Sequence, residues 1–237
     1  METRIPYKNI GLNANIFFNK NSKKCILFIC GGSLNTGKER FLGWQCELEE
    51  AEVSSVAFDY DGTPGTRDTV SISSLQSRID EVVTVVSWIK EEIKPEELIV
   101  YGVSMGGYIA LGATSLLPSA ISKLVLHAPA AYAKTAQGLL FDTTFTDAIS
   151  RPESWSDSLS FSWLNKFGKP ILFFQPEYDE VIPDKITERY VSIGNKKSNF
   201  THVYLRGAGH NCWGNSESDR TLRKKIFVEL GKFINNS

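Results

Sequence analysis

The feature that most constrains the fold of this 237-residue chain is an alternation of six short apolar runs with longer helical patterns. Each run is rich in Val, Ile, Leu or Phe and lacks polar alternation, so it predicts a strand buried on both faces. The runs cover residues 25–29, 53–58, 98–103, 124–126, 171–174 and 203–205. The clearest helical pattern covers residues 71–92, and Pro95 follows it. This order predicts an α/β domain whose central sheet is mainly parallel and carries helices on both faces.

Length and composition predict one domain over residues 1–237, because 42% of the residues are hydrophobic and suffice for one sizeable core. The alternation lapses once, in residues 128–169. This segment carries aromatic side chains with no regular period, namely Tyr132, Phe141, Phe145, Trp155, Phe161 and Trp163. A connection of this length is typically functional or has structure of its own. We therefore expect a short cap here, with a purely structural insertion as the alternative.

Charge and hydropathy narrow the choice of partner. The chain has 26 Lys and Arg against 27 Asp and Glu, and the basic residues are scattered, which argues against nucleic-acid binding. No apolar run approaches the roughly 18 residues of a membrane span, and the first residues lack the apolar region of a signal peptide. The sequence thus predicts a cytoplasmic protein that binds a small molecule. The cysteines show no metal-ligand spacing, so no metal or cofactor is expected; they are Cys25, Cys30, Cys46 and Cys212.

A candidate nucleophile stands in the sequence GVSMGG at residues 102–107. It follows an apolar run and precedes a helical pattern at residues 108–117, which is the context that a G-x-S-x-G nucleophile turn requires. Such a turn holds the serine in a strained backbone conformation, while small residues on either side let strand and helix pack closely. The pattern indicates that Ser104 is lifted to the edge of the sheet.

A serine hydroxyl needs a base, usually a histidine that a carboxylate orients. The chain has three histidines. His127 ends a predicted strand and His202 lies in or just before another, so both are expected to be packed or edge residues. His210 stands in the loop GAGHN after the last strand, where it can turn toward Ser104. We therefore take His210 as the candidate base.

The orienting acid is expected after another strand, between the nucleophile and the histidine in chain order. Residues 177–183, EYDEVIP, follow the run at 171–174 and contain three carboxylates. Glu180 and Asp184 border the next helix, where capping explains an acid. Asp179 is the candidate, and Glu177 is held in reserve.

These three segments together resemble the α/β-hydrolase superfamily. GVSMGG is similar to its nucleophile turn, EYDEVIP to its acid turn and GAGHN to its histidine loop, in the order Ser, Asp, His. The resemblance runs from about residue 25 to the end of the chain and implies an α/β-hydrolase fold. It also implies that the loop after the first core strand, Cys30-Gly31-Gly32, supplies a backbone N–H to an oxyanion hole. The implied donors are Gly32 and Met105, with Ser33 as the alternative if the register shifts by one.

The same loop permits a different interpretation. Gly32, Gly37 and Lys38 have the spacing of a phosphate-binding loop, but Glu39 stands where that motif requires Ser or Thr. A negative charge there disfavours bound phosphates, so a nucleotide site is the weaker hypothesis. An oxyanion loop would leave Lys38 to solvent, and we expect Lys38→Ala to be almost neutral for ester hydrolysis.

The sequence therefore predicts a serine hydrolase that cleaves a carboxylic ester, thioester or related acyl bond of a small molecule through an acyl-enzyme. An amide or peptide bond hydrolase with the same Ser-His-Asp triad is the alternative, and a non-catalytic ligand receptor is a weaker one. The residues expected to line the substrate pocket are Ser33, Phe141, Phe145, Trp155 and Trp213.

Overall fold

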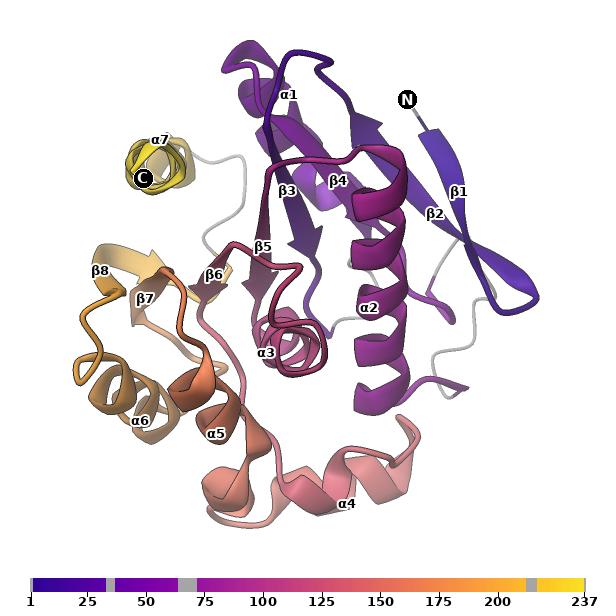
Figure 1. Cartoon of the computed structure of the whole chain (residues 1–237). Helices are drawn as coiled ribbons and strands as arrows, with labels where there is room; N and C mark the ends of the chain where they lie inside the picture. The colour runs from indigo at the N-terminus through magenta and orange to yellow at the C-terminus, as the bar shows by residue number, and fades with distance from the viewer. Residues whose placement is uncertain (1, 33–36, 64–71, 212–216, 237) are drawn as a thin grey trace.

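The computed structural model describes residues 2–32, 37–63, 72–211 and 217–236. One eight-stranded sheet crosses the molecule in the order β1-β2-β4-β3-β5-β6-β7-β8 (Figure 1). The strands are β1 (Glu2–Tyr7), β2 (Ile10–Phe17), β3 (Lys24–Ile29), β4 (Ser54–Phe58), β5 (Glu97–Val103), β6 (Lys123–His127), β7 (Ile171–Tyr178) and β8 (Phe200–Gly209). The six strands from β3 to β8 pair in parallel, which confirms the predicted parallel sheet and its six runs.

The N-terminal hairpin extends this sheet and was not predicted. β1 pairs antiparallel with β2, and β2 pairs antiparallel with β4, so β2 opposes the direction of the other strands. Burial alternates along β1, where Ile5 and Tyr7 face the interior and Pro6 between them is exposed. These strands therefore lack the continuous apolar run by which the other six were found.

Helices cover both faces of the sheet. They are α1 (Leu42–Glu50), α2 (Leu75–Glu92), α3 (Met105–Leu116), α4 (Thr143–Ser150), α5 (Leu159–Lys166), α6 (Asp184–Gly194) and α7 (Glu217–Asn235). α2 and α3 lie on one face, while α1 and α7 lie on the other, where Trp44 contacts Phe227 (Figure 1). α2 begins later than predicted because the Ser74 side chain accepts the N–H of Ser77 and caps the helix. Among the described helices, none has both the length and the apolarity that crossing a membrane requires.

The segment between β6 and β7 has structure of its own. It contains the 3-10 turns η3 (Lys134–Ala136) and η4 (Ser154–Asp157) as well as α4 and α5. α4 lies beyond the carboxyl ends of the parallel strands, toward which the arrowheads of β3 and β5 point (Figure 1). The start of α2 anchors this segment, since Gln76 donates its N–H to Gln137 and Phe141 donates its N–H to Ser73, both at 2.9 Å. The segment therefore stands at the edge of the sheet where loops gather.

Candidate active site

Ser104 lies in the sharp turn between β5 and α3. Its backbone has φ 54° and ψ −121°, in the left-handed region that residues other than glycine seldom adopt. The turn is held from beneath, because the Ser104 N–H donates to the His127 carbonyl at 2.9 Å. The predicted strained conformation at this serine is therefore confirmed.

Glycines are required around Ser104 because neighbouring backbone segments approach there too closely for a side chain. A Cβ on Gly102 would lie 2.3 Å from the Gly106 carbonyl oxygen, and one on Gly106 would lie 2.4 Å from the Ile29 carbonyl oxygen. No real side chain tolerates such contacts with backbone atoms. The G-x-S-x-G spacing thus reflects the packing of α3 against the ends of β5 and β3.

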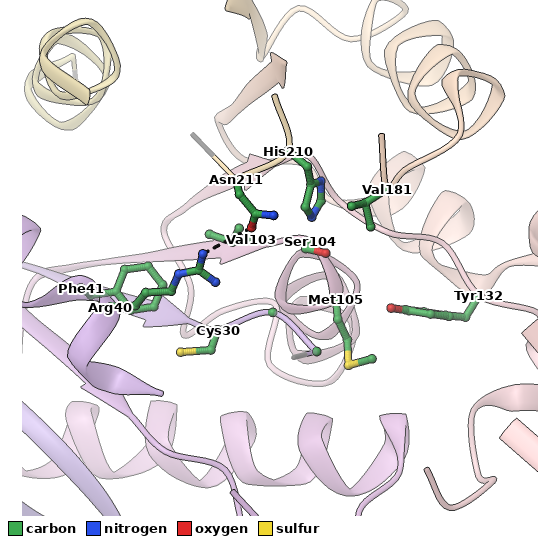
Figure 2. A pocket seen from close by; sticks show the side chains of 12 residues that line it. Cys30, Arg40, Phe41, Val103, Ser104, Met105, Tyr132, Val181, His210 and Asn211 are labelled. Atoms are coloured by element: carbon green, nitrogen blue, oxygen red, sulfur yellow. Dashed lines mark hydrogen bonds between the residues drawn. The ribbon is translucent and has the colours of Figure 1, made fainter. Parts of the chain in front are cut away.

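His210 and Asp179 meet beside Ser104. The His210 Nδ1 lies 2.9 Å from the Asp179 carboxylate, and the two side chains are only 8% and 6% exposed. The Asp179 Oδ1 also accepts the backbone N–H groups of Val181 and Ile182 at 2.9 and 2.8 Å. Burial acts to raise the pKa of Asp179, but the hydrogen bonds from His210 and from these amides outweigh it and hold the pKa below its usual value. Asp179 is therefore an ionised partner for the His210 ring, which points toward Ser104 (Figure 2).

The other two histidines are packed or lie on the edge strand, as predicted. His127 is fully buried, its Nδ1 lies 3.0 Å from the Tyr101 hydroxyl, and burial together with the nearby His210 lowers its pKa to about 3. His202 lies in β8 and contacts Gln175. Neither is in position to act on Ser104, so the structure brings together only His210 with the candidate serine.

The remaining carboxylates of the acid turn have other partners. Glu177 accepts the N–H of Gly207 at 2.7 Å, and it is Asp179 that contacts His210. Capping does not explain Glu180, contrary to the sequence prediction, because its carboxylate accepts the N–H of His210 at 3.3 Å. Asp184 begins α6, as predicted. Glu180 therefore braces the histidine loop.

The loop after β3 lies against the serine turn. A Cβ on Gly31 would lie 3.4 Å from the Cβ of Ser104, and one on Gly32 would lie 2.6 Å from the Cε of Met105. Cys30, the first residue of the loop, is buried, and burial raises the pKa of its thiol to about 12, so it is not a thiolate nucleophile. Ser33, the alternative donor, lies outside the described residues. The backbone of Gly31 thus lies beside Ser104, and the backbone of Gly32 lies beside Met105.

The structure overturns the prediction that Lys38 faces solvent. Its side chain is buried, and its ammonium lies 3.2, 3.0 and 3.1 Å from the carboxylates of Glu2, Glu39 and Asp59. Burial acts to lower the Lys38 pKa, but the hydrogen bonds to Glu39 and Asp59 raise it above its usual value. Asp59 also accepts the Lys38 backbone N–H at 2.7 Å. Lys38 thus anchors the loop by ion pairs. A nucleotide site would need the Lys38 ammonium to bind phosphates, but here it is paired with carboxylates, including that of Glu39.

Replacement of Lys38 by methionine should therefore lower the free energy of unfolding by about 3 kcal/mol, because it leaves the buried Asp59 carboxylate without its cation. Urea denaturation measures this loss. The matched control is Lys23→Met, which removes an exposed ion pair with Glu96 and should cost less than about 1 kcal/mol. Equal small losses in both variants would contradict the anchoring role.

A cavity of about 320 Å³ opens beside Ser104 (Figure 2). Its described lining comprises Cys30, Gly31, Gly32, Arg40, Phe41, Val103, Ser104, Met105, Tyr132, Val181, His210 and Asn211. The volume is at the lower end for small-molecule sites. Mixed apolar and polar walls around a serine suit a small organic substrate. In the described part of the chain, no cluster of three or more His, Cys, Asp or Glu side chains could hold a metal ion.

Three of the aromatic side chains expected in the pocket pack elsewhere. Phe141 and Phe145 contact each other with ring centroids 4.8 Å apart, and Trp155 contacts Phe161 at 6.2 Å. None of the three is among the described lining residues, because they join the segment to the body of the protein. Trp213, also expected there, lies outside the described residues. Tyr132 is the aromatic side chain of this segment that lines the cavity.

Arg40, Val181 and Asn211 line the cavity but were not predicted to do so. Val181 lies in the predicted acid turn and Asn211 follows His210, so the sequence did place both near the site. Arg40 carried no signal, because an arginine at the start of a helical stretch is commonly a solvated surface residue.

The chain matches the family model described as serine aminopeptidase, S33, over residues 21–152. Its structure is similar to that of the esterase Pf2001 from Pyrococcus furiosus, with a TM-score of 0.73, 17% identity, and 98% of this chain and 90% of that chain covered. It is also similar to Est1E from Butyrivibrio proteoclasticus, in a structure with bound ferulic acid, with a TM-score of 0.69, 17% identity, and coverage of 97% and 99%. No curated protein matches the chain in sequence.

Proposed function

Because the chain belongs to the serine aminopeptidase S33 family of α/β-hydrolases, and is thus a hydrolase, we propose that it cleaves a carboxylic ester, thioester or related acyl bond of a small molecule. The reaction proceeds through an acyl-enzyme on Ser104. Residues 128–169 serve as a short cap at the site. The observation that carries the proposal is the buried pair of His210 and Asp179, 2.9 Å apart, beside a serine in a strained turn.

In the first step the Ser104 Oγ attacks the acyl carbon while His210 accepts its proton. Asp179 holds the imidazole in the tautomer with hydrogen on Nδ1 and stabilises the imidazolium that forms. The backbone N–H groups of Gly32 and Met105 bind the oxyanion. His210 then returns the proton to the leaving alcohol or thiol, and water attacks the acyl-enzyme by the same sequence in reverse.

The alternative of an aminopeptidase has support from the family description. An aminopeptidase must bind the cationic amine at the start of a peptide, and a carboxylate in the pocket is the expected partner. The described lining residues include no carboxylate and do include Arg40. Their charge therefore favours an acyl ester or thioester over a peptide with a free amine.

Labelling with a fluorophosphonate probe tests the proposal, because the probe reacts only with an activated serine. We expect one label per chain, on Ser104, located by mass spectrometry. Parallel assays with 4-nitrophenyl esters, acyl thioesters and aminoacyl 4-nitroanilides should show turnover of the esters or thioesters. Labelling without any ester or thioester turnover, together with anilide cleavage, would establish the aminopeptidase instead.

The cap should act on substrate choice through Tyr132 and on stability through Phe145. Tyr132→Ala should change the ratio of kcat/KM between 4-nitrophenyl butyrate and octanoate by about tenfold, because it removes a contact in the cavity. Phe145→Ala should leave that ratio unchanged and lower the free energy of unfolding by about 3 kcal/mol, because the ring is buried. An unchanged ratio in Tyr132→Ala would remove the segment from substrate selection.

A further inference from the structure

We propose that Arg40 binds a carboxylate of the substrate, so that the preferred substrates are esters that carry a free carboxylate in addition to the scissile bond. This inference rests on the proposed function and names its substrate class. Among the described lining residues of the cavity, Arg40 is a cation and none is a carboxylate.

Arg40 brings a cation to the cavity without a matching anion. Its guanidinium extends from the Phe41 side of the cavity toward Asn211 and Val103 (Figure 2). The polar contact it makes there is a hydrogen bond of 3.3 Å to the neutral Asn211 Oδ1. No carboxylate of the described residues lies within 4.0 Å of it, and its neighbour Glu39 is paired with Lys38.

Two other cations of the described residues contrast with Arg40. Lys38 has three carboxylates around its ammonium, and Arg223 is paired with Glu47. Carboxylates of the protein itself thus neutralise these two cations. Arg40 is exposed, and the one hydrogen bond of its guanidinium goes to a neutral partner, so its other N–H groups are accessible to an anion that enters the cavity.

A second arginine strengthens the positive potential. Arg78, on α2, is 0% exposed, its Nη1 lies 3.2 Å from the Sδ of Met105, and its Nε and Nη2 have no hydrogen-bond partner. Burial raises the pKa of the nearby Glu81 to about 8, so that this carboxyl does not fully neutralise Arg78 at neutral pH. Burial dominates the pKa of the Cys30 thiol, Asp59 acts to raise this pKa further, and Arg40 and Arg78 act to lower it. The charges of both arginines therefore act at this wall of the cavity, together with the charge of Asp59, which is paired with Lys38.

The donors fit a carboxylate. Arg40 offers parallel N–H groups that match its two oxygens, and Asn211 accepts through its oxygen and keeps its amide N–H groups for a ligand. Arg78 is buried and is not among the described lining residues, so Arg40 is the cation that can contact a ligand directly. One guanidinium matches the single charge of a carboxylate, whereas a phosphate monoester carries nearly two near pH 7. The cavity of about 320 Å³ limits the substrate to a small acid, such as a half-ester of a short dicarboxylic acid.

The test compares matched pairs of esters that differ only in the free carboxylate. On the acyl side the pairs are 4-nitrophenyl hydrogen succinate, glutarate and adipate, each with its methyl ester. On the alcohol side the pair is 4-acetoxybenzoate and methyl 4-acetoxybenzoate. Background hydrolysis, including attack by the substrate's own carboxylate, is measured with the Ser104→Ala protein and subtracted.

We expect wild-type protein to have the higher kcat/KM for the charged member of at least one pair. Arg40→Gln should lower the charged-to-neutral ratio for that pair by about tenfold, Arg40→Lys should lower it less, and added salt should reduce it in the wild type. The responding pair shows whether the carboxylate belongs to the acid or the alcohol. The matched control is Lys23→Gln, which removes a positive charge near the start of β3, at the opposite edge of the sheet, and should leave the ratio unchanged.

A wild-type ratio that favours the neutral ester in every pair, or a ratio that Arg40→Gln does not change, would overturn the inference. Those results would leave the proposed function intact as long as the neutral esters are hydrolysed by wild type and not by Ser104→Ala. Failure of both members of all pairs in the wild type would count against the proposed function itself.

Discussion

Ser104→Ala should abolish labelling by a fluorophosphonate and lower kcat for ester hydrolysis on the order of 10⁴-fold or more. The alcohol oxygen that forms the acyl-enzyme is lost, while the backbone N–H groups of the loop after β3 and the walls of the cavity are kept. Alanine retains the Cβ of serine, so the turn keeps its φ of 54° and the packing of its neighbouring glycines. Stopped assays at saturating substrate, with thermal unfolding of the same preparations, measure both quantities.

The matched control for this variant is Ser115→Ala. Ser115 lies later on α3 and its hydroxyl donates to the Gly112 carbonyl within the helix, away from the cavity. It should keep wild-type turnover and labelling. If Ser104→Ala kept turnover within tenfold of wild type while folding normally, Ser104 would not be the nucleophile.

Asp179→Asn should lower kcat by about 10⁴-fold with little loss of stability. In the protein, Oδ1 of Asp179 accepts the N–H groups of Val181 and Ile182, and these bonds fix which atom of asparagine takes that place. The amide oxygen must remain there, so the amide nitrogen takes the place of Oδ2, which lies 2.9 Å from the His210 Nδ1. Oδ1 lies at the same distance from Nδ1, but two backbone N–H groups already occupy it. The ring then carries its hydrogen on Nε2 and cannot accept a proton from Ser104.

Glu177→Gln is the matched control for the acid. Glu177 also follows the β7 run, and its carboxylate accepts the Gly207 N–H, which a glutamine oxygen can continue to do. This variant should turn over esters within a few-fold of wild type. Full activity in Asp179→Asn combined with a large loss in Glu177→Gln would move the orienting role to the reserve residue.

The parallel core of the fold could be predicted because its signal is local. Strands buried on both faces need continuous apolar runs, and those runs lie where β3 to β8 were found. The hairpin of β1 and β2 could not be predicted in this way. Burial alternates along β1, polar Asn13 and Asn15 interrupt β2, and Pro6 and the turn at Lys8 also break any apolar run. The pairing of β2 with β4 supplies its stability, and such a contact leaves no trace in the local sequence.

In the active site, too, some features could be predicted from the local sequence and others depend on tertiary contacts. Ser104, Asp179 and His210 each stand in a loop after a strand, so the sequence indicated that they share one edge of the sheet. The burial of Lys38 depends on Asp59, which comes 21 residues later and from another strand end. The packing of Phe141 and Phe145 depends on how the segment after β6 folds back on α2. Contacts of this kind are decided by tertiary structure and not by spacing.

Because Ser104 has a left-handed backbone, a substitution that stabilises the fold at this position would remove the group that the chemistry needs. A glycine adopts φ 54° without the steric cost that a side chain incurs, which is about 1 to 3 kcal/mol. Selection for thermal stability alone would therefore favour Ser104→Gly, and the resulting protein would be more stable and would lack hydrolase activity. Libraries screened for thermal stability must be assayed for turnover in the same round, because one substitution at this residue raises stability and abolishes turnover.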